Sequence, residues 1–594
     1  WNFEQVVSVL SGLLGSLLSA NAFAKQRQQP KPDGAAQAKA RGLAKSARIV
    51  QQLGGSLLDA EAASPLFSLG PVPVCTRDSD LRRGDRHFTI ITTAALPWLT
   101  GTAVNPLLRA LSLAQAGRPV TLVLPWLQQA DQELLFPNGQ SFAEASEQEE
   151  VIYTWCRERA KADLEMLKTN FKMRWYPARY VKSVRSIFPV GDVSLNLCDK
   201  DPRDVLILEE PEHLCWYHHG QRWPHLFRHV IGIVHTNYQD YLVGHREENS
   251  KWSKHNLVPD EVKLFSVSAA CTIVCSAYCD VNIKLSDTIM PLPNEVTCNV
   301  HGVREEFLLV GDTMDGTSRS DGPSAYYLGK AIFEKGWREL LVNIDKAGPL
   351  CAGLRLDGYG SGADYDSIVA MPTGEAEVVM HPGRDHADED IHKYWVLINP
   401  STSDVLCTVT VEALAMGKQC VLARHPSNRF FEEFFPNRCH FFSPGDVIGF
   451  ANAIKVAMSK GPPRPLPAEQ RHVLTWEAAT ERLFEASEVR VLSGKHQRPS
   501  EVAASRLAYQ LHFDIMEDQS TLGELIKEAT LGESTPWDEY FAEWRRTSLF
   551  RVRRNALKLG RDFSLAKRPQ HIMEHELYLQ EQIKTLSSFF AAKS

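Results

Sequence analysis

From residue 87 onward, short apolar runs alternate with stretches in which apolar residues recur at helical spacing. Strands that alternate with helices in this way indicate βαβ units and a parallel sheet. In the first part of the chain, the pattern predicts strands at residues 87–92, 120–124, 205–208 and 230–235. A second series follows, with strands predicted at residues 325–328, 354–359, 378–380, 396–399 and 420–423.

The two series of strands indicate two domains. Residues 311–324 are rich in Gly, Ser and Asp and predict a linker between the series. We therefore expect an α/β protein with two Rossmann-like, doubly wound domains, whose strands end at a crevice that suits a ligand. The expected parts are an N-terminal extension at 1–85, domains at 86–310 and 325–475, a closing helix at 475–490, and a helical, basic extension at 491–594.

Composition narrows the class of protein without naming its chemistry. The 594 residues carry 65 Lys and Arg against 72 Asp and Glu, so the net charge of −7 does not favour a nucleic-acid binder. Hydrophobic residues make up 44% and charged residues 23%, which is ordinary for a soluble globular chain. The 12 Cys form no CxxC pair, and we expect the one cluster, Cys271, Cys275 and Cys279, to be small buried residues.

Both ends of the chain carry segments typical of membrane contact or targeting. Residues 6–24 lack charge and are long enough to span a bilayer, although their polar content also suits a buried or interfacial helix. Residues 25–48 hold seven basic residues and one acidic residue, as transit segments and flexible linkers both do. Residues 545–568 contain nine Lys and Arg among recurring apolar residues, which fits a membrane-surface helix or a helix packed on the protein.

The segment from Asn399 to Gly417, NPSTSDVLCTVTVEALAMG, contains the strongest local motif. A strand ends at Asn399, and we expect a helix to begin near Asp404 or Val405. Amides at a helix start bind anions such as a diphosphate. On one helix, Asp404 and Glu412 would lie about two turns apart and could hold two polyol parts of one ligand. The alternative is a capping Asp and a surface Glu.

Two further segments suit a phosphorylated ligand. Lys330 and Lys335, in Gly-Lys-x₄-Lys-Gly, could clamp a diphosphate, although exposed lysines are also common without such a role. Residues 96–103, LPWLTGTA, follow the first predicted strand and contain small residues that allow a close approach of backbone to ligand. They do not form GxGxxG, so a nicotinamide cofactor is not indicated.

Histidines offer weaker candidates. His235 ends a predicted strand, where an open α/β sheet places its ligand contacts, and the alternative is a hydrogen-bonded structural His. His386, Asp388, Asp390 and His392 could suggest a metal site, but their spacing does not put them on one helix face, and we expect no metal.

With these motifs in place, the second half resembles the retaining, nucleotide-sugar-dependent glycosyltransferases of family 4, which have the GT-B fold. That family carries Gly-Arg-x₄-Lys-Gly followed by Glu-x₇-Glu. Here Lys330 replaces the Arg and Asp404 replaces the first Glu, while Lys335 and Glu412 match. Lys lacks the bidentate fork of Arg, and Asp is shorter than Glu.

The resemblance is closer to the plastid galactosyltransferases that make galactolipids. It covers roughly residues 86–490, in the segments 92–110, 185–192, 208–223, 232–238, 383–418, 425–431 and 474–483. It implies transfer of galactose from UDP-galactose to the 6-hydroxyl of monogalactosyldiacylglycerol, with retention of the α configuration and without a metal or other cofactor.

The same resemblance implies roles for individual residues. Glu412 would bind the ribose, and Asp404 and His235 the donor sugar. Lys330 and Lys335 would bind the diphosphate together with the amides of Val405 and Leu406. Arg384 would lie at the base, and Gly101 and Thr102 in a small-residue loop beneath the phosphates.

A lipid acceptor implies a membrane surface as partner, with anionic lipids as a candidate component, and a peripheral location at the chloroplast outer envelope. Residues 172–185 mix five cations with three aromatic residues and suit an interfacial patch or an ordinary surface strand. Two alternatives to the galactosyltransferase remain open: a family-4 enzyme with another hexose donor or lipid acceptor, and a non-catalytic lipid-binding protein of this fold.

Overall fold

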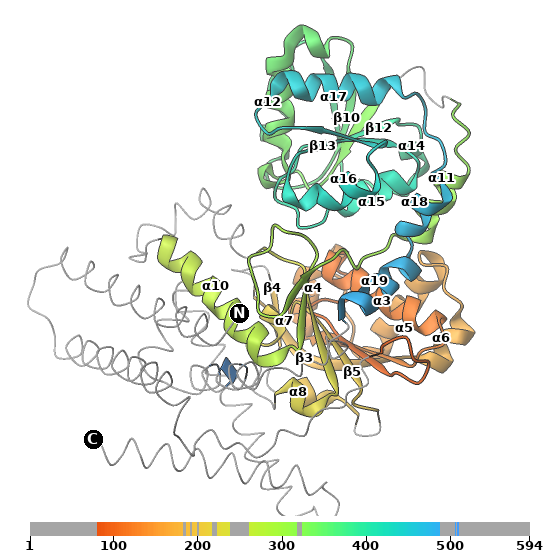
Figure 1. Ribbon diagram of the computed structural model, residues 1–594, viewed down its shortest axis with the longest axis vertical. Helices are drawn as coiled ribbons and strands as arrows, with labels where there is room; N and C mark the ends of the chain where they lie inside the picture. Colours follow the sequence, from red (N-terminus) through yellow and green to blue (C-terminus); the bar gives the residue numbers. More distant parts are fainter. Residues whose placement is uncertain are drawn as a thin grey trace, which may run out of the picture. The chain divides into compact units, whose positions relative to one another are not determined.

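A computed structural model of the chain describes residues 80–181, 186–189, 193–198, 201–216, 222–237, 260–317 and 324–487, together with Ser505, Ala508, Tyr509 and His512. This part of the chain forms two mainly parallel sheets with helices on their faces (Figure 1). The expected α/β class with two Rossmann-like domains, the GT-B architecture, is confirmed.

The first sheet is built from residues 88–297 in the order β4-β3-β2-β1-β5-β6-β7-β8. Its strands are β1 Phe88–Ile91, β2 Val120–Leu127, β3 Phe171–Val181, β4 Ser186–Pro189, β5 Val205–Glu209, β6 His229–Val234, β7 Val281–Lys284 and β8 Glu295–Thr297. All neighbouring strands are parallel except β3 and β4. The chain winds outward from β1 to one edge and then continues on the other side of β1, so a topological switch point lies between β1 and β5.

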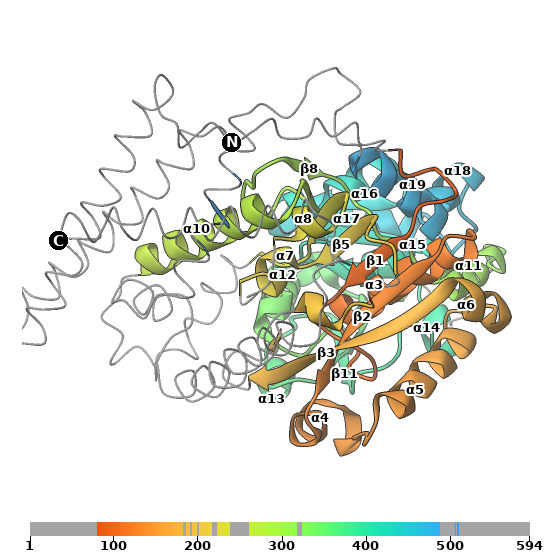
Figure 2. The same ribbon diagram turned by 90° about the horizontal axis from the view of Figure 1, so that it is seen from below.

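Helices flank this sheet on both sides, with α3, α5 and α6 on one side and α7 and α10 toward the other (Figure 2). The helices are α3 Gly101–Gln115, α4 Gln129–Leu135, α5 Ala145–Glu158, α6 Leu164–Asn170, α7 Pro211–Leu214, α8 Trp223–Leu226 and α10 Asp260–Tyr278. The next helix, α11 Glu305–Asp312, packs on the core of the second domain through Phe307 and Leu308. Because both faces are covered, the central strands β1, β5 and β6 are buried along their whole length, which explains their continuous apolar sequence.

The second sheet has the order β11-β10-β9-β12-β13-β14, and its strands are all parallel. Its strands are β9 Ala325–Leu328, β10 Arg355–Tyr359, β11 Glu377–His381, β12 Val396–Asn399, β13 Gln419–Ala423 and β14 Cys439–Phe442. The accompanying helices are α12 Trp337–Ala347, α13 Tyr365–Val369, α14 Glu389–His392, α15 Thr408–Ala415, α16 Arg429–Phe434, α17 Val447–Ser459 and α18 Ala468–Val473. Its switch point lies between β9 and β12.

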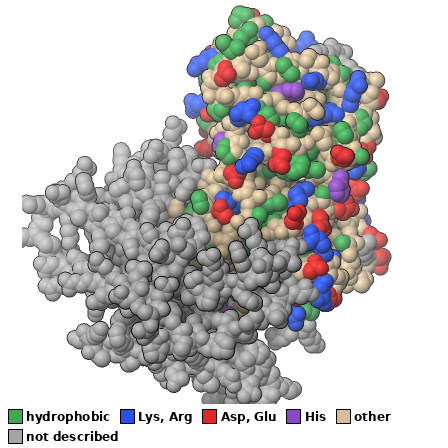
Figure 3. Space-filling model, in the orientation of Figure 1, with side chains coloured by type: hydrophobic (Ala, Val, Ile, Leu, Met, Phe, Trp, Pro, Cys, Tyr) green, Lys and Arg blue, Asp and Glu red, His purple; other side chains and the backbone are tan. Residues whose placement is uncertain are grey.

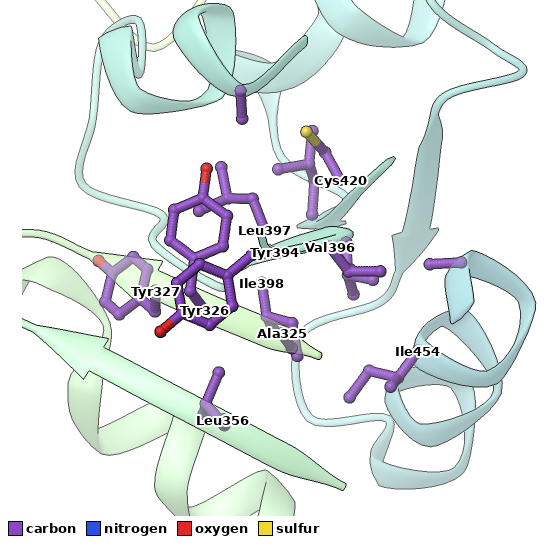
Figure 4. Close-up of a cluster of buried hydrophobic side chains, with 14 of the residues drawn as sticks. Ala325, Tyr326, Tyr327, Leu356, Tyr394, Val396, Leu397, Ile398, Cys420 and Ile454 are labelled. Carbon is purple, nitrogen blue, oxygen red and sulfur yellow. The ribbon is translucent and has the colours of Figure 1, made fainter. Parts of the chain in front are cut away.

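Aromatic and aliphatic side chains fill the core of the second domain. The rings of Tyr326 and Tyr394 stack with centroids 5.1 Å apart, and aliphatic residues of β12 surround them (Figure 4). Both tyrosines are completely buried. The buried hydroxyl of Tyr326 has a hydrogen-bond partner, His386, which belongs to the candidate site described below.

The last well-described helix, α19 Trp476–Ser487, packs on the first domain. Phe484 stacks on Phe88 of β1 with centroids 5.8 Å apart, and Leu483 is fully buried in the same core. Val303, near the end of the first domain, donates a backbone hydrogen bond to Leu474 just before α19. The chain therefore returns to its first domain after completing the second.

The structure corrects two expectations about segments. Gly311 and Asp312 belong to the last turn of α11 and not to a linker. Residues 171–181 form β3, in the body of the first sheet, where Tyr176 is buried and donates a hydrogen bond to the Thr92 carbonyl oxygen at 2.8 Å. Tyr176 is therefore a core residue and not an interfacial one.

The structure buries two of the three clustered cysteines as expected, whereas Cys271 is half-buried. Cys275 and Cys279 are buried, and burial raises the pKa of both thiols far above the usual range. Thiols with such pKa values are unreactive at neutral pH.

Among the described residues, no helix combines the length and the apolar character needed to cross a membrane. The predicted targeting and membrane segments at 6–24, 25–48 and 545–568 lie outside the described part of the chain. On the face seen in Figure 3, described basic and acidic side chains are interspersed.

Candidate active site

The candidate residues lie at the carboxyl ends of parallel strands in both sheets. In the first domain they follow β1, β5 and β6, and in the second they follow β9, β11 and β12. These strands include the pairs that flank the two switch points, β1 with β5 and β9 with β12. Open α/β sheets bind their ligands at this place, because the loops on either side of a switch point diverge and leave a crevice.

His235 follows β6 and contacts the end of β5. Its Nε2 lies 2.5 Å from Oε2 of Glu209, the last residue of β5. The Nε of Arg109, from α3, donates to the other carboxylate oxygen of Glu209 at 2.8 Å, and the side chains of Arg109 and Glu209 are both fully buried. Burial alone would raise the pKa of Glu209, but Arg109 and His235 outweigh it and hold this pKa below its usual value. Glu209 is therefore ionised at neutral pH.

A second buried histidine stacks beside the first. The ring centroid of His301 lies 5.0 Å from that of His235. Burial holds the pKa of His301 well below its usual value, so His301 is neutral at neutral pH. A donor atom from each of Glu209, His235 and His301 lies within 4.8 Å of the others, which is close enough to bind a metal ion. A divalent ion would, however, share the Glu209 carboxylate with the buried Arg109 cation, and the two positive charges would repel each other.

Glu210 ties the ends of three strands together. Its backbone is left-handed, with φ 64°, and its two carboxylate oxygens accept hydrogen bonds from the hydroxyls of Thr93 and Thr236 at 2.7 and 2.6 Å. Thr93 follows β1, and Thr236 follows β6. Side chains thus cross-link the carboxyl ends of β1, β5 and β6.

Gly101 and Thr102 form the first turn of α3, which corrects the expected loop. The Thr100 side chain caps this helix by accepting a hydrogen bond from the Thr102 amide at 3.2 Å. Within the described part of the chain, a Cβ at Gly101 would meet only the Asn105 side-chain amide, at an ordinary 3.6 Å. Gly101 is the first residue of α3, and a helix N-terminus favours a negatively charged ligand.

In the second domain, the two halves of the family motif meet. The Nζ of Lys335 lies 2.6 Å from Oδ1 of Asp404, joining the loop after β9 to the loop after β12. The Ser403 hydroxyl donates to the Glu334 carbonyl oxygen at 2.6 Å, and a Cβ at Gly336 would lie 3.0 Å from the Ser401 backbone. Gly336 also has φ 86°, so both the backbone conformation and the close approach require glycine there.

The helix after β12 begins later than expected. We predict its start near Asp404 or Val405, but α15 begins at Thr408 with Cys407 as its N-cap. Asp404 therefore lies in the loop, where it pairs with Lys335 and does not cap the helix. The expected separation of two helical turns between Asp404 and Glu412 is wrong. Within the described chain, the amides of Val405 and Leu406 form no hydrogen bond, so they can donate to a ligand.

Glu412, on α15, is held by His386 from the loop after β11. His386 Nδ1 lies 2.7 Å from Oε2 of Glu412, and its Nε2 lies 2.7 Å from the Tyr326 hydroxyl. Burial lowers the pKa of His386 although the nearby Glu412 raises it, so His386 is neutral at neutral pH. Because a carboxylate can only accept, Nδ1 carries the proton and Nε2 accepts from Tyr326. This pairing fits His386 as a support for Glu412 and not as part of a metal site with Asp388, Asp390 and His392.

The remaining predicted residues are more exposed. Lys330 is exposed after β9, and its carbonyl oxygen accepts a hydrogen bond from the Trp337 indole at 2.8 Å. Arg384 follows β11 and pairs with Asp388 and Asp390.

Sequence interpretation missed Arg109, Glu209, Glu210 and His301, and it considered His386 only as part of a metal site. Two consecutive acids at the end of an apolar strand, Glu209 and Glu210, were a usable signal, because buried carboxylates require partners. His386 gave no such signal, since its partner Glu412 is 26 residues away.

Comparison with known proteins identifies the family. No family model matches the chain. Digalactosyldiacylglycerol synthase 1, chloroplastic, of Arabidopsis thaliana is 46% identical over 411 residues, which are 68% of this chain and 48% of that protein. Digalactosyldiacylglycerol synthase 2, chloroplastic, of the same plant is 43% identical over 415 residues, which are 69% of this chain and 83% of that protein. This chain belongs to the digalactosyldiacylglycerol synthase family.

The chain spans about half the length of the type 1 synthases that it matches. Among solved structures, it is similar to the apo form of the lipopolysaccharide outer core galactosyltransferase WaaB, with 12% identity and a TM-score of 0.36 over 69% of this chain and 98% of that one. A TM-score this low supports no inference about the candidate site.

Proposed function

We propose that this chain transfers galactose from UDP-galactose to monogalactosyldiacylglycerol and forms an α-linked digalactosyl lipid. The observation that carries the proposal is its 43% identity over 83% of a relative named digalactosyldiacylglycerol synthase 2. The meeting of Lys335 with Asp404, at the carboxyl edge of the second sheet, adds a geometry suited to a nucleotide sugar.

The second domain would hold the donor. Lys335 is already next to Asp404, and its ammonium group can be shared between that carboxylate and a phosphate oxygen. The amides of Val405 and Leu406 and the N-terminus of α15 add donors for the same diphosphate. Glu412, oriented by His386, would accept hydrogen bonds from the ribose hydroxyls. Lys335 and the amides are in place before the reaction, so they can stabilise the negative charge that develops on the diphosphate without moving.

The proposed reaction depends on the groups that stabilise negative charge on UDP. The bond between the galactose C1 and the phosphate oxygen breaks, and negative charge grows on UDP, where Lys335 and the helix amides stabilise it. The acceptor 6-hydroxyl forms the new bond on the same face of C1, and its proton passes to the departing phosphate oxygen. The α configuration is retained, and neither an enzymic nucleophile nor a metal takes part in this proposal.

A transfer assay tests the donor and the acceptor together. Purified protein is incubated with monogalactosyldiacylglycerol in mixed micelles and with radiolabelled UDP-galactose or UDP-glucose, in the presence of EDTA. We expect a digalactosyl lipid from UDP-galactose alone. A product from UDP-glucose would indicate another hexose donor. UDP binding without any lipid product would indicate another acceptor or a non-catalytic lipid-binding role.

We also propose a peripheral location at the chloroplast outer envelope, supported by relatives named chloroplastic. The membrane contact we favour is the basic segment at residues 545–568. The competing patch on β3 is weaker, because Lys172 and Arg174 both lie 3.6 Å from Asp201 and Arg179 pairs with Asp131 at 2.7 Å. Surface cations that are already paired contribute little to binding an anionic surface.

Vesicle flotation separates these two contacts. Deletion of 545–568 should reduce flotation with anionic vesicles several-fold, whereas the double variant Lys172→Gln/Arg174→Gln should float like the wild type. The reverse result would assign the contact to β3, and unchanged flotation of both proteins would remove both segments as contacts.

A further inference from the structure

We infer that Glu209 is a positioning residue that fixes the tautomer of His235, so that Nδ1 of His235 accepts a hydrogen bond from a hydroxyl of the donor sugar. The inference rests on the proposed function for the identity of that sugar. It deepens that function by naming the atom of His235 that meets the ligand and the buried group that sets it.

The direction of the hydrogen bond fixes the tautomer. His235 Nε2 lies 2.5 Å from Glu209 Oε2, and an ionised carboxylate can only accept. Nε2 therefore carries the proton. In the neutral imidazole, Nδ1 then keeps its lone pair and accepts hydrogen bonds. A sugar hydroxyl can supply the matching donor.

Glu209 is constrained from both sides. Its Oε1 accepts from Arg109 Nε at 2.8 Å, while its Oε2 faces His235. Arg109 is itself fixed, because its Nη1 donates to the Val300 carbonyl oxygen at 2.9 Å. A fully buried carboxylate with both oxygens engaged has little freedom to turn, so the orientation of the imidazole follows from the core of the first domain.

The position of His235 suits a contact with substrate. It follows β6 at the carboxyl edge of the first sheet, and Thr236 beside it is anchored to Glu210 at 2.6 Å. The neutral ring of His301 packs against His235 and adds no charge. A metal ion held by Glu209, His235 and His301 is the competing use of this cluster, and it would require a nitrogen lone pair of His235 for the metal.

Binding measurements with matched variants test the inference without turnover. The Kd values for UDP-galactose and for UDP are measured by calorimetry for the wild type, Glu209→Gln, His235→Gln and the double variant. The amide nitrogen of Gln at 235 can replace the Nε2 donor, but Gln offers no counterpart of Nδ1. We expect both single variants to bind UDP-galactose about tenfold more weakly and UDP within about twofold of wild type. The double variant should be no weaker than His235→Gln alone.

Additive losses in the double variant would overturn the inference, because they would show that Glu209 acts independently of His235. Equal weakening of UDP and UDP-galactose would overturn it too. If Glu209→Gln fails to fold because Arg109 is left as an unpaired buried cation, the variant Arg109→Met/Glu209→Gln removes both charges and takes its place.

Nitrogen-15 spectra of the histidine rings separate this inference from the proposed function. The wild type should show His235 protonated at Nε2, assigned by the loss of its signals in His235→Gln, and Glu209→Gln should disturb that signature. A chain that keeps this tautomer yet transfers no galactose would contradict the proposed function alone. A His235 protonated at Nδ1, or a stoichiometric metal lost in His301→Gln, would contradict the inference.

Discussion

Three of the residues expected to contact the donor, His235, Glu412 and Asp404, are each held by a side chain from a different element. Glu209 holds His235, His386 holds Glu412, and Lys335 holds Asp404. The sequence spacing identified Lys335, Asp404 and Glu412 as candidates, because their motif is local. It did not identify the support of His235 by Glu209 or of Glu412 by His386, because the two residues of each pair are 26 positions apart and no local pattern links them.

Lys335→Ala tests the phosphate contact. Loss of the ammonium removes a charge that stabilises departing UDP, so kcat/KM for galactose transfer should fall about a hundredfold. The matched control is Lys346→Ala, an exposed lysine on α12, which should leave kcat/KM unchanged. Transfer by Lys335→Ala at a rate near that of the wild type would remove Lys335 from the phosphate site.

His386→Phe tests the support of Glu412. The ring volume is kept, but Glu412 loses its donor, so KM for UDP-galactose should rise about tenfold while kcat changes less than about threefold. His386→Asn, whose amide nitrogen can replace Nδ1, should recover most of the affinity. Steady-state kinetics on both variants make the comparison, and equal KM values for Phe and Asn would contradict the proposed pairing.

At the scale of helices and strands, the alternation of apolar runs predicted β1, β2, β5 and β6 and most of the second sheet, including β9 and β12 with their observed bounds. Most of these strands are buried, so their sequences are mainly apolar, whereas the edge strand β11 is partly exposed. The pattern missed β3, whose residues alternate between buried and polar positions and include Pro177. It also missed β4, β7, β8 and β14, which are at most four residues long.

The start of α15 shows why a local rule failed. Asp404 is a suitable capping residue, but the ion pair with Lys335, 69 residues away, uses its carboxylate. Cys407 becomes the N-cap, although its side chain accepts no hydrogen bond from the helix amides. A long-range contact thus outweighs a local preference worth about 1 kcal/mol.

Lys418→Met tests how the strands and helices of the second domain are joined. Lys418 is fully buried, and its ammonium donates to the carbonyl oxygens of Ile391 and Tyr394 at 2.8 and 2.7 Å. Methionine has a similar shape but leaves these oxygens without their donor, so we expect a loss of about 3 kcal/mol and a fall in Tm of several degrees. The control Lys455→Met, on the exposed side of α17, should not change Tm. Equal Tm values for the two variants would contradict this role.

At the scale of the whole molecule, buried neutral histidines make stability depend on pH. Burial lowers the pKa values of His213, His301 and His386 below their ordinary value near 6.5. The unfolded chain therefore binds more protons than the fold does as pH falls through that value, so stability is complete above it and is lost below it. Thermal melts should show Tm falling from pH 7 to pH 5.5, with a shallower fall in His301→Gln. A Tm that is constant or rises over this range would contradict the burial of these rings as neutral groups.

The two domains repeat one architecture, with a switch point between β1 and β5 in the first and between β9 and β12 in the second. The side chains that we propose for donor binding lie at the carboxyl ends of strands beside these points. The ends of the chain carry the remaining predictions about targeting and membrane contact, and they lie outside the described residues.

The most direct test of the central claim is the structure of the lipid product made by the purified chain from UDP-galactose and monogalactosyldiacylglycerol. Proton NMR of the isolated lipid should show a second galactose joined at the 6-position through an α linkage, and Lys335→Ala should make the same product far more slowly. A β-linked product, or the absence of galactosyl transfer by the wild type, would contradict the account.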